Sequence, residues 1–297
     1  MSAVASQKVA FRERTTRALR DSNLQQAMGK ARGGFVDKRL EAMAALPEFD
    51  ETRDAARDIK DHVLANLDGY LELYEQKVIE NGGQVHWART AEEACQIVAD
   101  ICKEANAQVV TKGKSMVSEE MHLNSVLEAA GLKVVETDLG EYIVQLAGET
   151  PSHIIAPAVH KTREQITELF HEHHSKLGYT DRVTQREALV NEARSVLRGT
   201  FVTADVGITG ANFLVAETGA NVIVTNEGNG DLTSSLPRVH IVTAGIEKVI
   251  PSLDDLSVLL RVLARSATGQ EMSAYTSLYS GPRQDTDSEG PEAYHVV

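Results

Sequence analysis

The chain has few of the residues that cross-link a protein or anchor it in a membrane. Its 297 residues include two cysteines and one tryptophan, and aromatic residues make up 5% of the total. Two cysteines cannot build a disulfide framework, and no apolar run reaches the roughly 20 residues that cross a bilayer. The first residues also lack the apolar core of a secretory signal. We therefore expect a cytoplasmic protein with no transmembrane segment.

Charge is unevenly distributed along the chain. Residues 1–40 hold nine Lys and Arg but three acidic residues, whereas the whole chain carries a net charge of −13. A basic arm on an acidic body could dock on an acidic partner, a membrane face or its own body, or it could be a solvated helical extension. Nucleic-acid binding is disfavoured because the acidic body would repel phosphates.

Hydrophobic periodicity divides the chain into three parts. Over residues 1–80, apolar residues recur at spacings of three and four, which predicts a helical extension with the basic arm at 1–40. Over 81–268, short apolar runs alternate with capped helices. This alternation predicts an α/β domain whose mostly parallel sheet is covered by helices on both faces. Residues 269–297 show little periodicity, so we expect an irregular tail that leads to a further C-terminal segment.

Caps and apolar runs give local expectations within the α/β part. Thr90, Thr162 and Ser252 have the sequence context of helix N-caps, and Ser118 is expected to start a helix. Gly199 is expected to end one. Strands are expected at, among other places, 133–136, 142–146, 154–156, 201–203 and 239–243.

Two loops form the core of the candidate site. Residues 111–116, Thr-Lys-Gly-Lys-Ser-Met, lie between a predicted strand and a predicted helix. Backbone N–H groups at a helix N-terminus, with two lysines, suit a phosphate or carboxylate, although an ordinary strand-to-helix turn is the alternative. Residues 205–212, Asp-Val-Gly-Ile-Thr-Gly-Ala-Asn, form a predicted glycine loop. Its spacing differs from G-x-G-x-x-G, so dinucleotide binding is unsupported. The loop could contact a ligand, or it could be a tight turn that only packing requires.

A third segment, Thr225–Gly230, places an acidic side chain among glycines after a predicted strand. Glu227 is the candidate catalytic residue, as a nucleophile or general base. It could instead be a hydrogen-bond acceptor that holds the loop, or a solvated turn residue. The candidate ligand-binding residues are Lys112, Lys114, Ser115, His160, Asp205, Gly207, Gly210, Asn212, Gly228 and Asn229.

The histidines and cysteines favour core or surface roles over a metal site. His171 and His174 are three residues apart on a predicted helix, but no cysteine is nearby and the flanking residues are charged. Cys95 and Cys102 lie on one face of another helix, whereas iron–sulfur clusters need closely spaced thiolates. We therefore predict no metal site in this chain. His160, after Pro157, is the better pocket candidate among the histidines.

Four blocks together closely resemble the LUD-domain family, and within it the iron–sulfur proteins of bacterial L-lactate oxidation. They are residues 111–116, 204–212, 225–230 and 245–249, and the resemblance extends over nearly the whole chain. It implies a sheet like that of the NagB/RpiA/CoA-transferase superfold. It also implies NAD-independent oxidation of L-lactate to pyruvate, with electron transfer, together with two other lactate-utilization subunits.

The resemblance further implies two [4Fe-4S] clusters, which full-length family members hold through C-x-x-C-x-x-C runs in a ferredoxin-like C-terminal segment. Those cysteines are absent here, so we expect this chain to be truncated before that segment, to hold no cofactor and to be inactive alone. We expect its pocket to bind a small anionic ligand. Two other hypotheses remain: a stand-alone CoA-transferase-like enzyme using Glu227, and a partner-binding scaffold without a small-molecule ligand.

Overall fold

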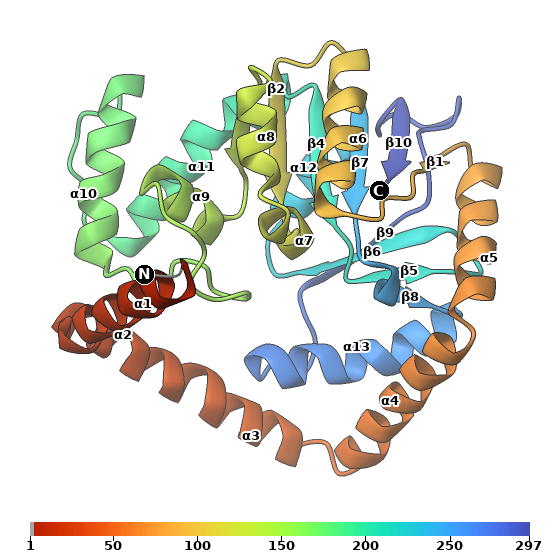
Figure 1. Ribbon diagram of the computed structural model, residues 1–297, viewed down its shortest axis with the longest axis horizontal. Helices are drawn as coiled ribbons and strands as arrows, with labels where there is room; N and C mark the ends of the chain where they lie inside the picture. Colours follow the sequence, from red (N-terminus) through yellow and green to blue (C-terminus); the bar gives the residue numbers. More distant parts are fainter. Residues whose placement is uncertain (1–2) are drawn as a thin grey trace.

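A six-stranded parallel sheet forms the centre of the molecule (Figure 1). The computed structural model describes residues 3–297, with side chains from residue 11 onward. The sheet has the order β1-β10-β7-β4-β2-β3, and every neighbouring pair is parallel. Its strands are β1 (Gln84–Val85), β10 (Ala293–Val296), β7 (Val239–Thr243), β4 (Val206–Gly210), β2 (Val109–Gly113) and β3 (Lys133–Glu136).

Helices cover both faces of this sheet, as the alternation predicts. Because successive side chains of a strand point to opposite faces, Val134 and Val135 of β3 enter different cores. Val134 packs in the core beneath α6 and α8, and Val135 in the core beneath α9, α10 and α11. The helices are α6 (Ala91–Glu104), α7 (Met116–Glu120), α8 (Leu123–Ala129), α9 (Leu139–Leu146), α10 (Arg163–His174), α11 (Arg186–Thr203) and α12 (Asn229–Ser235).

A second, smaller sheet lies beside the first, and the sequence does not predict it as a separate unit. Its order is β8-β5-β6-β9, with antiparallel pairing of β6 to both neighbours. A shared core joins the two sheets: Val242 and Val296 come from the large sheet, and Leu214 and Val249 from the small one. The strands are β5 (Phe213–Val215), β6 (Ala220–Thr225), β8 (Val249–Ile250) and β9 (Tyr275–Tyr279).

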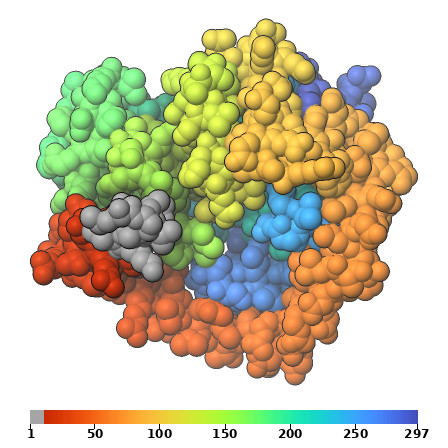
Figure 2. Space-filling view, viewed as in Figure 1, coloured from red at the N-terminus to blue at the C-terminus, as the bar shows by residue number. Residues whose placement is uncertain are grey.

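Residues 3–80 are mainly helical, and those beyond residue 10 run from the lower left of Figure 2 along the bottom to the right-hand side. α3 and α4 pack against α13 (Leu253–Thr268), which covers the small sheet. The described Lys and Arg side chains of the basic arm are exposed; that of Lys8 lies outside the described side chains. The elements are α1 (Ala3–Arg20), α2 (Ser22–Arg32), a π-helical turn (Gly33–Asp37), α3 (Lys38–Ala44), α4 (Phe49–Ala65) and α5 (Leu67–Glu80). Among residues 3–297, no helix combines the length and apolarity that crossing a bilayer requires.

Several local predictions are wrong. Residues 142–146 belong to α9, residues 154–156 form no strand, and residues 201–203 continue α11 beyond Gly199. Short apolar runs do not distinguish a buried strand from a buried helix, which explains the errors at 142–146 and 201–203. Ile154 and Ile155 instead lie exposed in a bend. The N-cap of α7 is Ser115, whose hydroxyl accepts the Ser118 N–H, so the helix begins earlier than predicted. The caps at Thr90, Thr162 and Ser252 are confirmed.

Two larger corrections concern the sheets. The predicted glycine loop at 205–212 is mostly β4, a buried strand in the middle of the large sheet. The segment 269–297, expected to be irregular, contributes β9 to the small sheet and β10 to the large one. β10 lies between β1 and β7 and pairs with both, so a strand near the end of the chain joins β1 to the rest of the sheet. Such long-range pairing leaves little local signal in a four-residue strand.

Candidate functional site

The carboxyl ends of β2, β3, β4 and β7 meet at one edge of the large sheet, where ligands bind in open parallel sheets. Lys114 and Ser115 follow β2, Asp138 follows β3, and Thr243 ends β7. Glu227 lies in the loop after β6, and its hydrogen bond with Lys114 shows that it reaches the same edge. We call Lys114, Asp138 and Glu227 the edge cluster.

Lys114 is the central cation of the edge cluster. Its Nζ donates to a carboxylate oxygen of Asp138 and, at 2.9 Å, to Oε2 of Glu227. Burial lowers the pKa of Lys114, but the charges of the two carboxylates outweigh this effect and hold that pKa above its usual value. The Lys114 backbone has φ +62°, a left-handed conformation that a lysine adopts only at a cost of roughly 1–3 kcal/mol.

Glu227 is the open member of the cluster. Its side chain is 60% exposed, whereas those of Lys114 and Asp138 are 18% and 20% exposed. The Thr225 hydroxyl donates to Glu227 Oε2 at 3.0 Å and accepts the Glu227 backbone N–H at 3.2 Å. Both bonds hold the carboxylate over Lys114, so the structure shows the loop-holding role that the sequence left as one alternative. Whether Glu227 is catalytic stays a prediction.

Ser115 is buried below the edge cluster in a chain of hydroxyls. Its Oγ lies 2.7 Å from Thr243 Oγ1, which also lies 2.9 Å from Ser118 Oγ. Ser115 is 1% exposed and Ser118 is fully buried. Ser115 therefore links the end of β2 to the end of β7 and caps α7, and its hydroxyl has bonding partners without any ligand.

Lys112 does not reach the edge. Its side chain is fully buried; it pairs with Glu119 and, at 2.8 Å, with Glu136. Burial alone would lower the pKa of Lys112, but the nearby carboxylates, Glu136 first, raise it above the usual value. Glu141 lies in the same surroundings, where burial and the charges of Glu136 and Asp138 raise its pKa to about 8. We call these four residues the internal cluster.

Glycines bring the loops of the edge together. A Cβ at Gly207 would overlap the carbonyl oxygen of Thr233, so α12 packs directly on β4. A Cβ at Gly210 would overlap the carbonyl oxygen of Lys114, so the end of β4 accommodates the unusual backbone after β2. Gly228 precedes α12 and has no close neighbour, whereas Asn229 donates from Nδ2 to the Thr137 carbonyl at 3.0 Å. Both glycines of β4 thus serve packing, and whether they also contact a ligand stays a prediction.

Three predicted ligand-binding residues are engaged elsewhere. Asp205 precedes β4 at the amino edge of the sheet, where its carboxylate accepts the N–H groups of Gln108 and Val109. Asn212 bridges β5 and β6 by accepting the Val224 N–H. His160 bonds to Ser152 and Glu149 within its own loop. Their roles in ligand binding stay predictions, and the structure gives each one a local bonding role.

Asp138, the partner of Lys114, is not among the site residues that the sequence predicts. Asp138 caps α9, whose Gly140 N–H it accepts at 3.0 Å. Because the following residues were expected to form a strand, this position did not stand out as a strand-to-helix turn. An Asp two residues after a predicted strand and before Gly140 was the available signal.

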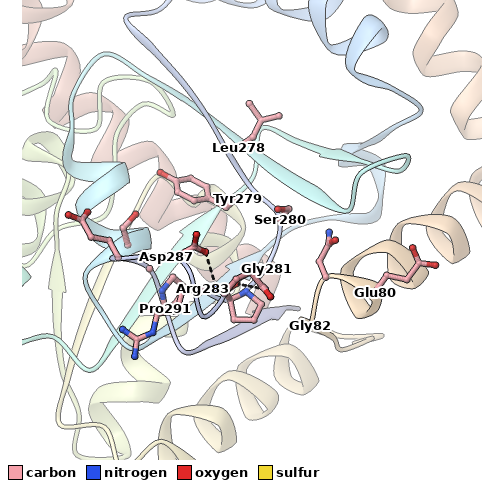
Figure 3. Close-up of a pocket in the computed structure, with 15 residues that line it drawn as sticks. Glu80, Gly82, Leu278, Tyr279, Ser280, Gly281, Arg283, Asp287 and Pro291 are labelled. Carbon is pink, nitrogen blue, oxygen red and sulfur yellow. Dashed lines mark hydrogen bonds between the residues drawn. The ribbon is translucent and has the colours of Figure 1, made fainter.

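Several open cavities lie outside the edge cluster. One of about 640 Å³ lies between the end of α5, β9 and the loop that leads to β10 (Figure 3). Pro291, just before β10 begins, lines this cavity, which therefore lies towards the amino edge of the sheet. Arg283, another lining residue, pairs with Glu292 at 3.0 Å. A cavity of about 440 Å³ includes Asn212 and Lys60. A third, of about 460 Å³, lies at the carboxyl ends of β1, β10 and β7.

The residues present do not fit an iron–sulfur cluster. Cys95 and Cys102 are both buried on α6, and Cys95 Sγ donates to the Met121 carbonyl. Burial raises the pKa of both thiols, that of Cys102 to about 12, which disfavours the thiolate that such a cluster requires. Within residues 3–297, no three His, Cys, Asp or Glu side chains are grouped so as to hold a metal ion.

Residues 71–297 match the family described as the LUD domain. The chain belongs to the LUD-domain family. This match confirms the family that the four sequence blocks predict, and it includes β9 and β10 within the LUD domain.

The curated relatives of this LUD protein are longer than it is. The chain is 45% identical over 97% of its length to lactate utilization protein B of Bacillus velezensis, and 43% identical to the protein of that name in Bacillus subtilis. It is 42% identical to the uncharacterized electron transport protein YkgF of Escherichia coli. In each case it spans 60% of the relative. Among solved structures, a DUF162 family protein from Deinococcus radiodurans matches with a TM-score of 0.43 and 11% identity, over 77% of this chain and 96% of that one.

Proposed function

We propose that this chain is the LUD portion of an iron–sulfur protein of lactate utilization, which takes part in NAD-independent oxidation of L-lactate to pyruvate. The observation that carries the proposal is the 42–45% identity, over 97% of the chain, to proteins named lactate utilization protein B. The name of the Escherichia coli relative, an electron transport protein, supports the redox part of the proposal.

In this proposal the chain works in the cytoplasm with two other lactate-utilization subunits. The [4Fe-4S] clusters belong to the part of a full-length protein that this chain does not span, since its own two cysteines are buried on one helix. Two unpaired thiols are also typical of a reducing compartment. The LUD portion then contributes ligand binding and docking, and the chain alone does not oxidise lactate.

We place the anionic ligand at the edge cluster. Lys114 is the lysine of the 111–116 motif that reaches the edge, and it stands in a strained backbone conformation of the kind found at functional sites. Two carboxylates exceed its single positive charge, so a further anion gains nothing while both remain in place. A ligand carboxylate therefore takes the place of Glu227, the more exposed of the two.

Titration of the purified chain with L-lactate and with pyruvate, followed by calorimetry, tests this placement. We expect Lys114→Met to weaken binding at least tenfold, about 1.4 kcal/mol, because it removes the cation. We expect Glu227→Gln to strengthen binding, because the competing charge is gone. Lys133→Met, at an exposed lysine on β3, is the matched control and should bind like the unchanged chain.

The same variants distinguish the rival functions. Equal binding by Lys114→Met and the unchanged chain would place the ligand elsewhere. Absence of binding by either compound would favour a partner-binding scaffold. A hydroxylamine-sensitive acyl adduct on Glu227 after incubation with an acyl-CoA, absent in Glu227→Gln, would instead make the chain a CoA-transferase-like enzyme.

A further inference from the structure

The cavity of about 460 Å³ at the carboxyl ends of β1, β10 and β7 is separate from the edge cluster. Neither Lys114 nor Glu227 lines it, whereas Val117 and Met121 of the α7 region form part of its wall. The volume falls in the range of small-molecule sites, about 300–1,000 Å³. Its position outside the carboxyl ends of parallel strands is also where such sites occur.

The interior of this cavity is mainly apolar. Leu71 comes from α5, Leu214 from β5, Ala94 from α6 and Ile246 from the turn after β7. Four separate elements thus present hydrocarbon to one space. Contacts with such walls favour a ligand with an apolar body, because they remove apolar surface from water.

Trp87 gives this cavity a flat aromatic wall. It is the single tryptophan of the chain, and its side chain is 45% exposed. The indole N–H donates to Glu75 Oε1 at 3.0 Å, which ties the ring to α5 and leaves its faces for contact. Aromatic rings pack well against such a face in offset or edge-to-face geometry.

The polar groups of the cavity point to an uncharged ligand. Its two charged side chains, Arg89 and Glu120, have opposite signs and are both exposed. His86 bonds through Nε2 to Nδ1 of His295 at 3.1 Å, and burial lowers the pKa of His86, which favours the neutral ring. Among the described residues no partner contacts the other ring nitrogen of His86, so a ligand N–H or hydroxyl can bond there.

We propose that this cavity binds a small, flat, uncharged aromatic molecule, which packs on the Trp87 indole and makes one hydrogen bond to His86. The site is independent of the anion site proposed at the edge cluster. Failure of either one leaves the other untouched, because the two share no lining residue.

The single tryptophan makes the test direct. N-phenyl-1-naphthylamine is a neutral aromatic amine that absorbs where tryptophan emits, so its binding beside Trp87 transfers energy from the indole. We expect titration of the unchanged chain to reduce Trp87 emission in a saturable, one-to-one manner. Trp87→Phe should abolish the energy transfer, while the emission of the probe itself still rises on binding.

Two filling variants locate the site. Ala94→Phe places a ring in the cavity from α6, and Ala88→Phe places one from the loop after β1. We expect each to weaken probe binding about tenfold or more. Ala55→Phe, at an exposed position of α4 outside the cavity, is the matched control and should leave binding unchanged.

Circular dichroism shows which variants keep the native fold, and either filling variant is sufficient. The proposal is overturned if the unchanged chain shows no saturable loss of Trp87 emission. It is also overturned if a folded Ala94→Phe or Ala88→Phe chain binds the probe as tightly as the Ala55→Phe control.

Discussion

Lys112 and Lys114 are two residues apart in one motif, yet they lie in opposite environments. The Lys112 side chain is fully buried and pairs with Glu119 and Glu136, of which Glu136 is 3% exposed. The Lys114 side chain is 18% exposed and pairs with Glu227, which is 60% exposed. The first cation belongs to an enclosed network, and the second faces a loop that solvent reaches.

Backbone geometry explains this difference. Lys112 lies within β2, and its side chain contacts residues of α7 and β3, whose carboxylates enclose it. Lys114 lies beyond the strand, where its positive φ turns the chain away from the sheet. A lysine-rich strand-to-helix turn can therefore supply one lysine to the interior and one to a site.

Lys112→Met tests the enclosed side of this comparison and should have the largest effect. It leaves the buried Glu136 without a counter-charge, and breaking a buried pair in this way costs about 3–5 kcal/mol of unfolding free energy. Urea denaturation measures the loss, with Lys133→Met on β3 as the matched control. A loss of unfolding free energy below about 1 kcal/mol would contradict the inference that the buried Glu136 carboxylate depends on the charge of Lys112.

The sequence predicts those parts of the fold that have local signals. The N-caps Thr90, Thr162 and Ser252 and the strand β7 follow from side-chain chemistry and short-range patterns, and the structure contains them. β4 was not predicted because its glycines resemble a loop, although Gly207 is there so that α12 can pack on the strand and Gly210 so that the backbone of Lys114 can approach it. β10 was not predicted because its partners, β1 and β7, are distant in sequence.

The sequence predicts that Lys114 and Glu227 lie together but not which carboxylates pair with each lysine, and ligand binding there stays a prediction. Lys114 and Glu227 do meet at one edge of the sheet, as the two motifs indicate. Lys112 is buried and Lys114 reaches the edge, and the two lysines pair with different carboxylates. These are Glu119 and Glu136 for Lys112 and Asp138 for Lys114, and they lie on other elements. Spacing within a motif carries no information on carboxylates that only the tertiary fold brings to it.

Glu141→Gln tests the charge state of the internal cluster through pH. Burial first, and then the charges of Glu136 and Asp138, raise the pKa of Glu141 from 4.5 to about 8. Between these values the folded chain keeps a proton that the unfolded chain releases, so unfolding free energy falls as pH rises from about 4.5 to about 8. Glutamine mimics the neutral carboxyl, so we expect the variant to lose much of this pH dependence.

Urea denaturation at several pH values from 5 to 8 gives the measurement for Glu141→Gln. The exposed Glu172→Gln on α10 is the matched control and should keep the pH dependence of the unchanged chain. If Glu141→Gln and this control have parallel pH profiles, Glu141 is already ionised at pH 5, and the internal cluster carries more negative charge than we infer.

Lys114→Gly tests the open side of the comparison and should have the smallest effect on stability. The variant loses two ion pairs, one with Asp138 and one with the exposed Glu227. An exposed ion pair contributes about 0–1 kcal/mol to stability. Glycine also adopts φ +62° without the strain that lysine bears there, which offsets the loss. We expect a net change in unfolding free energy within about 1 kcal/mol, with Lys114→Met, which keeps the strain, less stable than Lys114→Gly. If Lys114→Gly were as destabilising as Lys112→Met, both lysines would have structural roles. That result would contradict the proposal that the edge cluster binds a ligand.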